Sequence, residues 1–214
     1  MPHPKVIFLD AVGTLFGVKG SVGQIYSEIA KSFGVDANPE KLNQAFFKNF
    51  KAAPPMAFPG IDPTSVPAQE YAWWKAIAIS TFKMAKVYDQ FSDFDNFFGD
   101  LYFHFATAKP WFIYPDVQGC LEYWRSQRIE LGVLSNFDSR IYPVLELLNL
   151  ANFFKSVTIS TEVGAAKPNP QVFAIALQKH NCLASEAWHV GDSYEQDYEG
   201  AKTAGLKGIW LNRK

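Results

Sequence analysis

The chain has 214 residues, enough for one sizeable hydrophobic core or for a core with a small second unit. Its 48% hydrophobic content is that of a globular protein, and its formal net charge of -1 gives no electrostatic case for a nucleic acid or an anionic membrane as partner. We find no secretory leader and no apolar run that could span a bilayer, so we expect a soluble, cytoplasmic protein.

The first half of the chain begins with one strand and continues with helices. Residues 6–9 form an apolar run that predicts a buried strand. Between Phe16 and about Phe112, apolar residues recur three and four apart, which predicts four amphipathic helices at residues 25–33, 42–50, 71–82 and 91–105. Five prolines between residues 54 and 67 predict a loop between the second and third helices.

One face of the predicted fourth helix is strongly aromatic, because residues three and four apart on it are Phe94, Phe97, Phe98, Leu101 and Phe105. Such a stripe is compatible with a partner surface, but apolar helix stripes normally face a core, and we expect these residues to pack inside the helical unit. The adjacent Trp73 and Trp74 point to different sides of their helix, so one can be core while the other lines a cleft or an interface.

The second half alternates strands and helices. Strands are predicted at residues 129–134, 156–160, 187–190 and 207–211, and helices at 141–150, 170–179 and 195–204. This alternation predicts an α/β fold, a doubly wound, Rossmann-like parallel sheet interrupted by an α-helical insertion. We assign residues 1–16 and 113–214 to the core domain and residues 17–112 to the inserted helical domain.

Chemically capable residues follow the predicted strands. Asp10, Ser135 and Asp192 stand at or just after strand ends, as does Asn136, and Lys167 lies in the loop after the strand at 156–160. Ligands of doubly wound sheets bind at this edge. A carboxylate such as Asp10 can act as a nucleophile, and two carboxylates can share a Mg²⁺ ion. Asp197 could orient Lys167 or a metal-bound water.

Other reactive residue types form no competing site. Cys120 and Cys182 have no metal or redox spacing, and the histidines show neither zinc spacing nor a Ser-His-Asp order. We expect His189 to be packed in its strand beside Gly191, and His180 to sit at a helix C-terminus, where the helix dipole favours it.

The motifs, taken in order, resemble those of the haloacid dehalogenase (HAD) superfamily. They are Asp10-Ala11-Val12-Gly13-Thr14, Ser135-Asn136, Lys167-Pro168 and Gly191-Asp192-Ser193 through Asp197. The helical insertion resembles the C1 cap of subfamily I, and the residues of the motifs look most like those of the rhythmically expressed gene branch. The resemblance spans essentially the whole chain and implies a hydrolase with a helical cap.

The resemblance also implies roles for single residues. Asp10 is the expected nucleophile, Ser135 and Lys167 serve the phosphoryl group, and Thr14 and Asn136 bind the substrate. Mg²⁺ is the expected cofactor, with Asp10, Asp192 and the backbone carbonyl of Val12 as ligands, while Asp197 and Ser193 support the site. The expected partner is a small phosphorylated metabolite, and the sequence gives no indication of oligomeric state.

Val12 departs from the family pattern, because HAD phosphatases carry a second aspartate there as the general acid and base. Without this aspartate the enzyme loses general acid–base catalysis, which contributes roughly 10²- to 10⁴-fold to the reaction rate. Three functions stay open: a phosphohydrolase that is weak or limited to good leaving groups, a non-catalytic binding protein, and a C–P or C–halogen hydrolase. Against the last, the chain has no arginine before Arg125 to bind a haloacid carboxylate, and it keeps the metal-type Gly191-Asp192.

Overall fold

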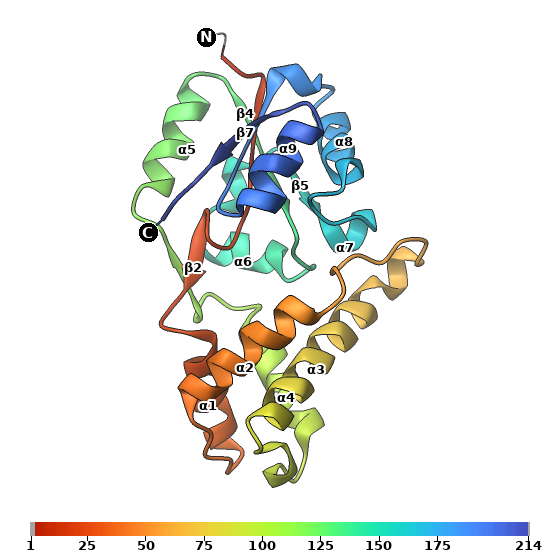
Figure 1. Ribbon diagram of the computed structural model, residues 1–214. Helices are drawn as coiled ribbons and strands as arrows, with labels where there is room; N and C mark the ends of the chain where they lie inside the picture. The colour runs from red at the N-terminus through yellow and green to blue at the C-terminus, as the bar shows by residue number, and fades with distance from the viewer. Residues whose placement is uncertain (1–2, 214) are drawn as a thin grey trace. The chain divides into compact units, whose positions relative to one another are not determined.

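The computed structural model describes residues 3–213, which divide into two compact units. Unit 1 contains the chain up to Gly17, the segment Met56–Val66 and the chain from Phe112 onward, and unit 2 contains Val18–Pro55 and Pro67–Trp111. Figure 1 shows the course of the chain through both units. None of the helices in residues 3–213 has the length and apolar character needed to cross a membrane.

Unit 1 is built on a five-stranded parallel sheet with the strand order β5-β4-β1-β6-β7. Its strands are β1 (Val6–Leu9), β4 (Glu130–Ser135), β5 (Ser156–Ile159), β6 (Ala187–Gly191) and β7 (Lys207–Trp210). The chain adds β4 and β5 on one side of the central β1, then returns to add β6 and β7 on the other. The predicted Rossmann-like α/β sheet is confirmed, with the switch in strand order at β1.

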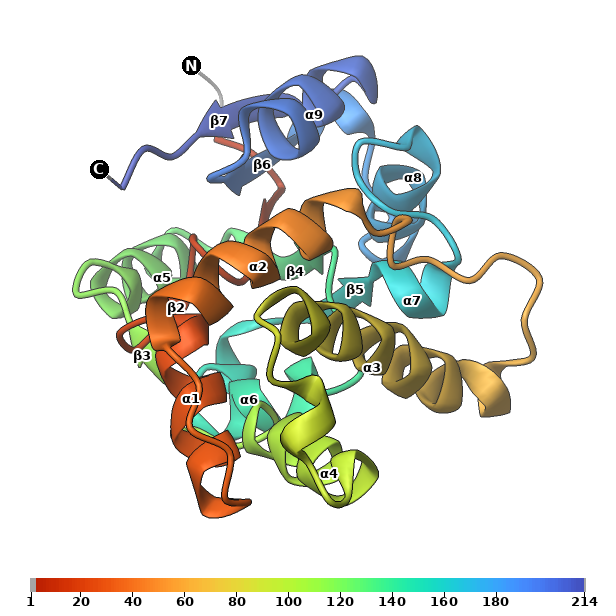
Figure 2. The same ribbon diagram turned by 60° about the horizontal axis from the view of Figure 1, so that its bottom comes forward.

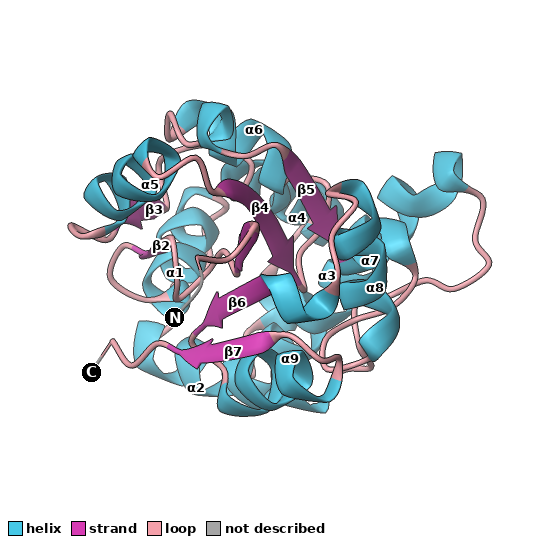
Figure 3. Ribbon diagram, turned by 90° about the horizontal axis from the view of Figure 1, so that it is seen from above, coloured by secondary structure: helices cyan, strands magenta, loops and turns pink. Residues whose placement is uncertain are grey.

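Helices cover both faces of this sheet. Figure 3 looks down on it, with α5 and α6 on one side and α8 and α9 on the other, as right-handed crossovers require. The helical segments of unit 1 are η1 (Pro63–Ser65), α5 (Val117–Ser126), α6 (Ile141–Leu147), η3 (Ala151–Phe153), α7 (Ser160–Val163), α8 (Pro170–Lys179), η4 (Ala184–Glu186), η5 (Tyr194–Glu199, π-helical) and α9 (Gly200–Thr203). Asn169 caps α8 through the amide of Gln171, and Pro170 occupies the first turn.

Unit 2 is helical, as expected, and Figure 2 shows its four main helices. They are α1 (Val22–Ser32), α2 (Pro39–Ala52), α3 (Val66–Met84) and α4 (Phe94–His104), with the short turn η2 (Tyr88–Gln90) before α4. Apolar spacing located these helices but missed the first turns of α1, α2 and α3, and it placed the start of α4 three residues too early. The missing starts are polar: Ser21 forms a capping box with Gln24, and Asn38 caps α2.

The aromatic stripe of α4 lies in the core of unit 2. Phe97, Phe98 and Leu101 are at most 2% exposed, and Phe105 packs against the same cluster. Burying one such side chain contributes roughly 1.5–3 kcal/mol, so the stripe is a large part of what holds the four helices together. The expectation of a core role over a partner surface is confirmed.

Three features of the fold were not predicted. Two three-residue strands, β2 (Phe16–Val18) and β3 (Trp111–Ile113), pair with each other and are too short to show an alternating pattern. Helix α5 was also missed. The proline-rich segment Met56–Val66, expected in the inserted domain, is grouped with unit 1, where Ser160 Oγ donates to the carbonyl of Met56 at 2.6 Å.

A partly buried polar network ties together the amino ends of two strands. His180, directly after α8, lies between Glu130 Oε2 (2.7 Å from Nδ1) and Ser156 Oγ (2.7 Å from Nε2). The order Ser-His-Glu matches a nucleophilic triad, but a Cβ on Gly132 would lie 2.9 Å from both Ser156 Oγ and the ring of Phe8. The hydroxyl is packed into the sheet, so we read the network as a structural tie between β4, β5 and α8.

Candidate active site

Three neighbouring strands bring the predicted site residues to one edge of the sheet. Asp10 directly follows β1, Ser135 ends β4 and Asp192 directly follows β6. The last residue of β1, Leu9, pairs in register with Val133 of β4 and Val190 of β6. Because parallel strands in register end at the same edge, the nucleophile candidate lies between the other two motifs.

Lys167 joins two of the carboxylates in the interior of unit 1. Its Nζ donates to Asp10 Oδ1 at 2.8 Å and to Asp197 Oδ1 at 2.5 Å, and all three residues are buried. Burial alone would lower the pKa of Lys167, but the charges and hydrogen bonds of Asp10 and Asp197 outweigh it and raise the pKa above its usual value. Lys167 is therefore a fixed positive charge beside Asp10.

Asp197 is held by three donors. Besides Lys167, His189 Nε2 lies 2.8 Å from Oδ1, and the backbone N–H of Ser193 donates to Oδ2 at 2.9 Å. Burial would raise the pKa of Asp197, but the charge of Lys167 and the bond to His189 hold it well below its usual range. Ser193 supports the acid, as the motif implied, through its backbone; its hydroxyl accepts from Gln196 N and caps η5.

Two motif glycines are required by close approach. A Cβ on Gly191 would lie 2.1 Å from Asp197 Cγ, and a Cβ on Gly13 would lie 2.4 Å from Asp192 Oδ2. Gly13 also has φ +88°, a conformation that side chains disfavour. The glycines of the first and fourth motifs therefore let these two carboxylates reach the site.

Asp192 is exposed, and its environment is unfavourable to a second negative charge. Partial burial, and then the charges of Asp10 and Asp197, raise its pKa to about 6. One carboxylate oxygen from each of these three residues lies within 4.8 Å of the others. Crowded oxygen ligands of this kind suit a hard divalent cation.

Asn136 is committed to Lys167. Its Oδ1 accepts from Lys167 N at 2.7 Å, and its Nδ2 donates to Lys167 O at 2.9 Å and to Gln196 Oε1 at 3.2 Å. The structure thus brings Asn136 to the site as a brace for the lysine loop, whereas we expected it to bind substrate. Gln196 was not singled out from the sequence, where an exposed glutamine on a helix carries no signal.

The remaining predicted residues lie in the first two motifs. Ser135 and Thr14 are buried, at 3% and 2% exposure, and Thr14 Oγ1 has no hydrogen-bond partner among residues 3–213. Val12 is half-buried in the turn after β1, where it forms an isolated bridge with Phe16. Its side chain offers no proton donor or acceptor.

His189 was expected to be packed, and it is fully buried in β6. Its bond to Asp197 was not predicted, although a histidine inside an apolar strand signals a polar partner, because buried polar groups are almost always hydrogen-bonded.

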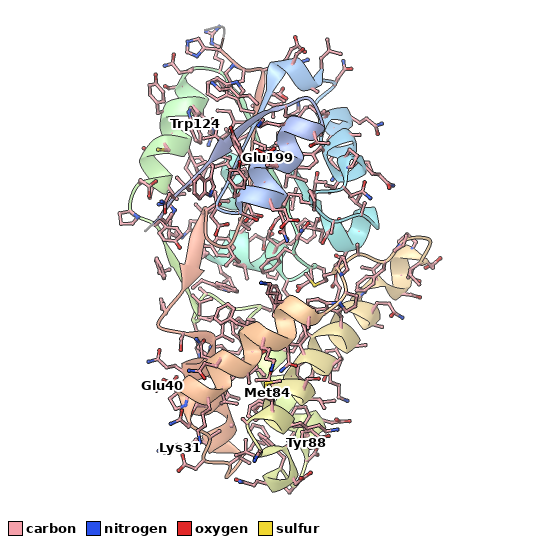
Figure 4. The ribbon with its side chains drawn as sticks, viewed as in Figure 1. Lys31, Glu40, Met84, Tyr88, Trp124 and Glu199 are labelled. Atoms are coloured by element: carbon pink, nitrogen blue, oxygen red, sulfur yellow. The ribbon has the colours of Figure 1, made fainter. Side chains whose placement is uncertain are left out.

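A separate surface hollow of about 470 Å³ lies in unit 2 and is lined by none of the predicted site residues. Tyr88, labelled in Figure 4, is part of its lining, together with Asp93 and Asp95. Asp95 pairs with Lys75 at 2.8 Å, and Asp93 caps α4. These carboxylates have structural roles, so the hollow does not compete with the site at the sheet edge.

Comparison with known proteins agrees with this arrangement. A family model described as haloacid dehalogenase-like hydrolase matches residues 4–205. The chain is 30% identical over 211 residues to haloacid dehalogenase-like hydrolase domain-containing protein 3 of Danio rerio, covering 97% of this chain and 85% of that protein. It is 28% identical over 224 residues to the rhythmically expressed gene 2 protein of Drosophila melanogaster, covering 98% and 84%.

A solved structure shares the fold. The HAD phosphatase from Thermococcus onnurineus superimposes with a TM-score of 0.63 at 22% identity, covering 98% of this chain and 87% of that one. The resemblance seen in the motifs, to the superfamily and to its rhythmically expressed gene branch, is confirmed. The chain belongs to the haloacid dehalogenase-like hydrolases.

Proposed function

We propose that the protein is a Mg²⁺-dependent phosphohydrolase that acts on a small phosphorylated metabolite with a good leaving group. The observation that supports this most strongly is the contact of Lys167 Nζ with Asp10 Oδ1 in a buried site beside Asp192. A nucleophilic carboxylate, a fixed cation and a second carboxylate are the groups that phosphoryl transfer to an aspartate uses.

In the proposed reaction, Asp10 attacks phosphorus through the oxygen that Lys167 does not hold. A P–O bond to Asp10 forms, and the bond to the leaving group breaks with its electron pair. Water then hydrolyses the aspartyl-phosphate, releasing inorganic phosphate and restoring Asp10. Lys167 offsets the charge of the transferred group throughout, and Ser135 binds a phosphoryl oxygen.

The carboxylates of Asp10 and Asp192, with the carbonyl of Val12, would hold Mg²⁺. Asp197 is a poorer ligand, because three donors already occupy its two oxygens. Bound there, Mg²⁺ would neutralise charge on the phosphoryl group as it is transferred. The crowding that raises the pKa of Asp192 to about 6 supports a cation at this position and disfavours the C–halogen alternative, which needs none.

Val12 determines which substrates turn over. Without an acid at this position, an alkoxide leaves poorly, whereas a carboxylate or phosphate leaves without protonation. We therefore propose acyl phosphates or phosphoanhydrides as the substrate class. We further propose that the helical unit acts as the cap that selects among them.

The test is phosphate release from acetyl phosphate and from glycerol phosphate, with Mg²⁺ and with EDTA. We expect release from acetyl phosphate only, dependent on Mg²⁺ and abolished in Asp10→Asn. Asp95→Asn makes the same substitution on the surface of unit 2 and should behave as wild type. Phosphate release that persists in Asp10→Asn would overturn the assignment of Asp10 as the nucleophile. Metal-independent halide release from L-2-haloacids would overturn the proposed substrate class. Phosphate binding without turnover of any substrate would show a binding protein instead of an enzyme.

A further inference from the structure

His189 lies at the start of a chain of contacts that ends at the nucleophile. It occupies the middle of β6, and its Nε2 contacts Asp197 Oδ1 at 2.8 Å. The same oxygen accepts from Lys167 Nζ, which reaches Asp10 Oδ1. Every member of this chain is buried, and the proposed reaction assigns no role to the histidine.

The contacts determine which proton His189 carries. A carboxylate only accepts hydrogen bonds, so the hydrogen must sit on Nε2. Nδ1 is buried and has no hydrogen-bond partner among residues 3–213, so a second proton there would be an unsatisfied buried donor. Burial also lowers the pKa of His189. His189 is thus a neutral donor, with the ring of Phe173 packed edge-on 5.5 Å away.

This donor decides the orientation of Asp197. Two donors on Oδ1 and one on Oδ2 define a single rotamer, in which the carboxylate faces Lys167. Without His189, Asp197 keeps only Lys167 and the Ser193 amide. Oδ1 then loses one of its two donors, so the carboxylate is no longer held in this single orientation. A lysine that follows it would leave Asp10.

We infer that His189 is a positioning residue: as a neutral Nε2–H donor it holds Asp197 as the counter-ion of Lys167 and keeps Lys167 on Asp10. The consequence for turnover rests on the proposed function, whereas the effect on Lys167 does not. Because a displacement of about 1 Å in a catalytic group can cost on the order of 100-fold, the contribution of His189 to kcat is larger than its distance from the substrate suggests.

Three variants separate positioning from packing. His189→Leu keeps the bulk and removes the donor, and His189→Gln places an amide N–H near the position of Nε2. Phe173→Leu loosens the packing against the histidine and touches none of the contacts in the chain. We expect kcat for acetyl phosphate to fall roughly 10- to 100-fold in His189→Leu, with KM within about threefold. His189→Gln should recover most of kcat, and Phe173→Leu should lose stability and keep kcat.

NMR on the substrate-free protein tests the same inference independently of turnover. ¹⁵N spectra should report a neutral Nε2–H ring for His189. The Lys167 ammonium should exchange slowly with water in wild type and His189→Gln, and faster in His189→Leu. An Nδ1–H or charged ring, or an unchanged Lys167 signal in His189→Leu, overturns the inference. If the wild-type protein does not hydrolyse acetyl phosphate, the proposed function fails, but the exchange rate of the Lys167 ammonium still decides the role of His189.

Discussion

Asn136 holds the backbone of Lys167 at both of its polar groups. Oδ1 accepts the Lys167 N–H at 2.7 Å, and Nδ2 donates to the Lys167 carbonyl at 2.9 Å. The two residues are 31 positions apart and lie in different loops. These two hydrogen bonds form a clasp that fixes the main chain from which the Lys167 side chain reaches Asp10. The second motif therefore positions the lysine of the third motif even without bound substrate.

Removing the clasp should lower activity and stability together. Asn136→Ala leaves two partly buried backbone groups of Lys167 without these partners, at a cost of about 1–3 kcal/mol each if water does not replace them. We expect a lower melting temperature and a lower kcat for acetyl phosphate. Asn49→Ala is the matched control, because it removes a single hydrogen bond from the Asn49 side-chain amide to the Ala45 carbonyl in α2. Full activity in Asn136→Ala would contradict a role for the clasp.

This clasp marks the boundary of what the sequence could predict. Asp10 and Asp192 were placed correctly at the sheet edge because strand periodicity and parallel topology determine where strands end. The partner of Asn136 depends on the path of the loop that carries Lys167, and no local pattern encodes that path. The same holds for Met56–Val66, whose prolines predict a loop but not its association with unit 1, where Met56 accepts a hydrogen bond from Ser160.

Restoring the missing acid should broaden the substrates. Val12→Asp places a carboxyl in the half-buried turn after Asp10, where HAD phosphatases carry their general acid. We expect glycerol phosphate turnover to rise by roughly 10²- to 10⁴-fold, the usual worth of general acid–base catalysis. Acetyl phosphate turnover should rise less, because its leaving group needs no proton. Val12→Asn, similar in size but unable to transfer a proton, should leave the ester rate low, and equal gains in both variants would count against the explanation.

Gly191 should tolerate no side chain. The added methyl group of Gly191→Ala would meet Asp197 Cγ at 2.1 Å, which forces the carboxylate away from Lys167 or bends β6. Overpacking of this kind costs about 1–3 kcal/mol, and kcat should fall with it.

Gly119→Ala is the control for Gly191→Ala, since a Cβ there has no neighbour within 4 Å and the position lies inside α5. It should stabilise the protein by up to about 1 kcal/mol. Urea unfolding of both variants measures the contrast. Equal effects at the two glycines would show that Asp197 does not need the space.

Stability should fall in mild acid because of His180. Burial lowers the pKa of His180 below its ordinary value of 6.5. As the pH drops below about 6.5, His180 takes up a proton in the unfolded chain, but in the folded protein it does so only below its lower folded pKa. The free energy of unfolding therefore falls as the pH drops between these two pKa values, and His180 causes no further fall below the folded pKa. One proton changes the free energy of unfolding by at most about 1.4 kcal/mol per pH unit.

His180→Gln cannot take up this proton, and its free energy of unfolding should decline less between pH 7 and pH 5 than that of wild type. His189, whose pKa burial also lowers, should leave a residual decline in the variant. Urea unfolding at half-unit pH steps measures both curves, with His3→Gln at an exposed position as the control. A wild-type pH dependence in His180→Gln would show that folding does not lower the pKa of His180, because a group makes stability depend on pH only where its folded and unfolded pKa values differ.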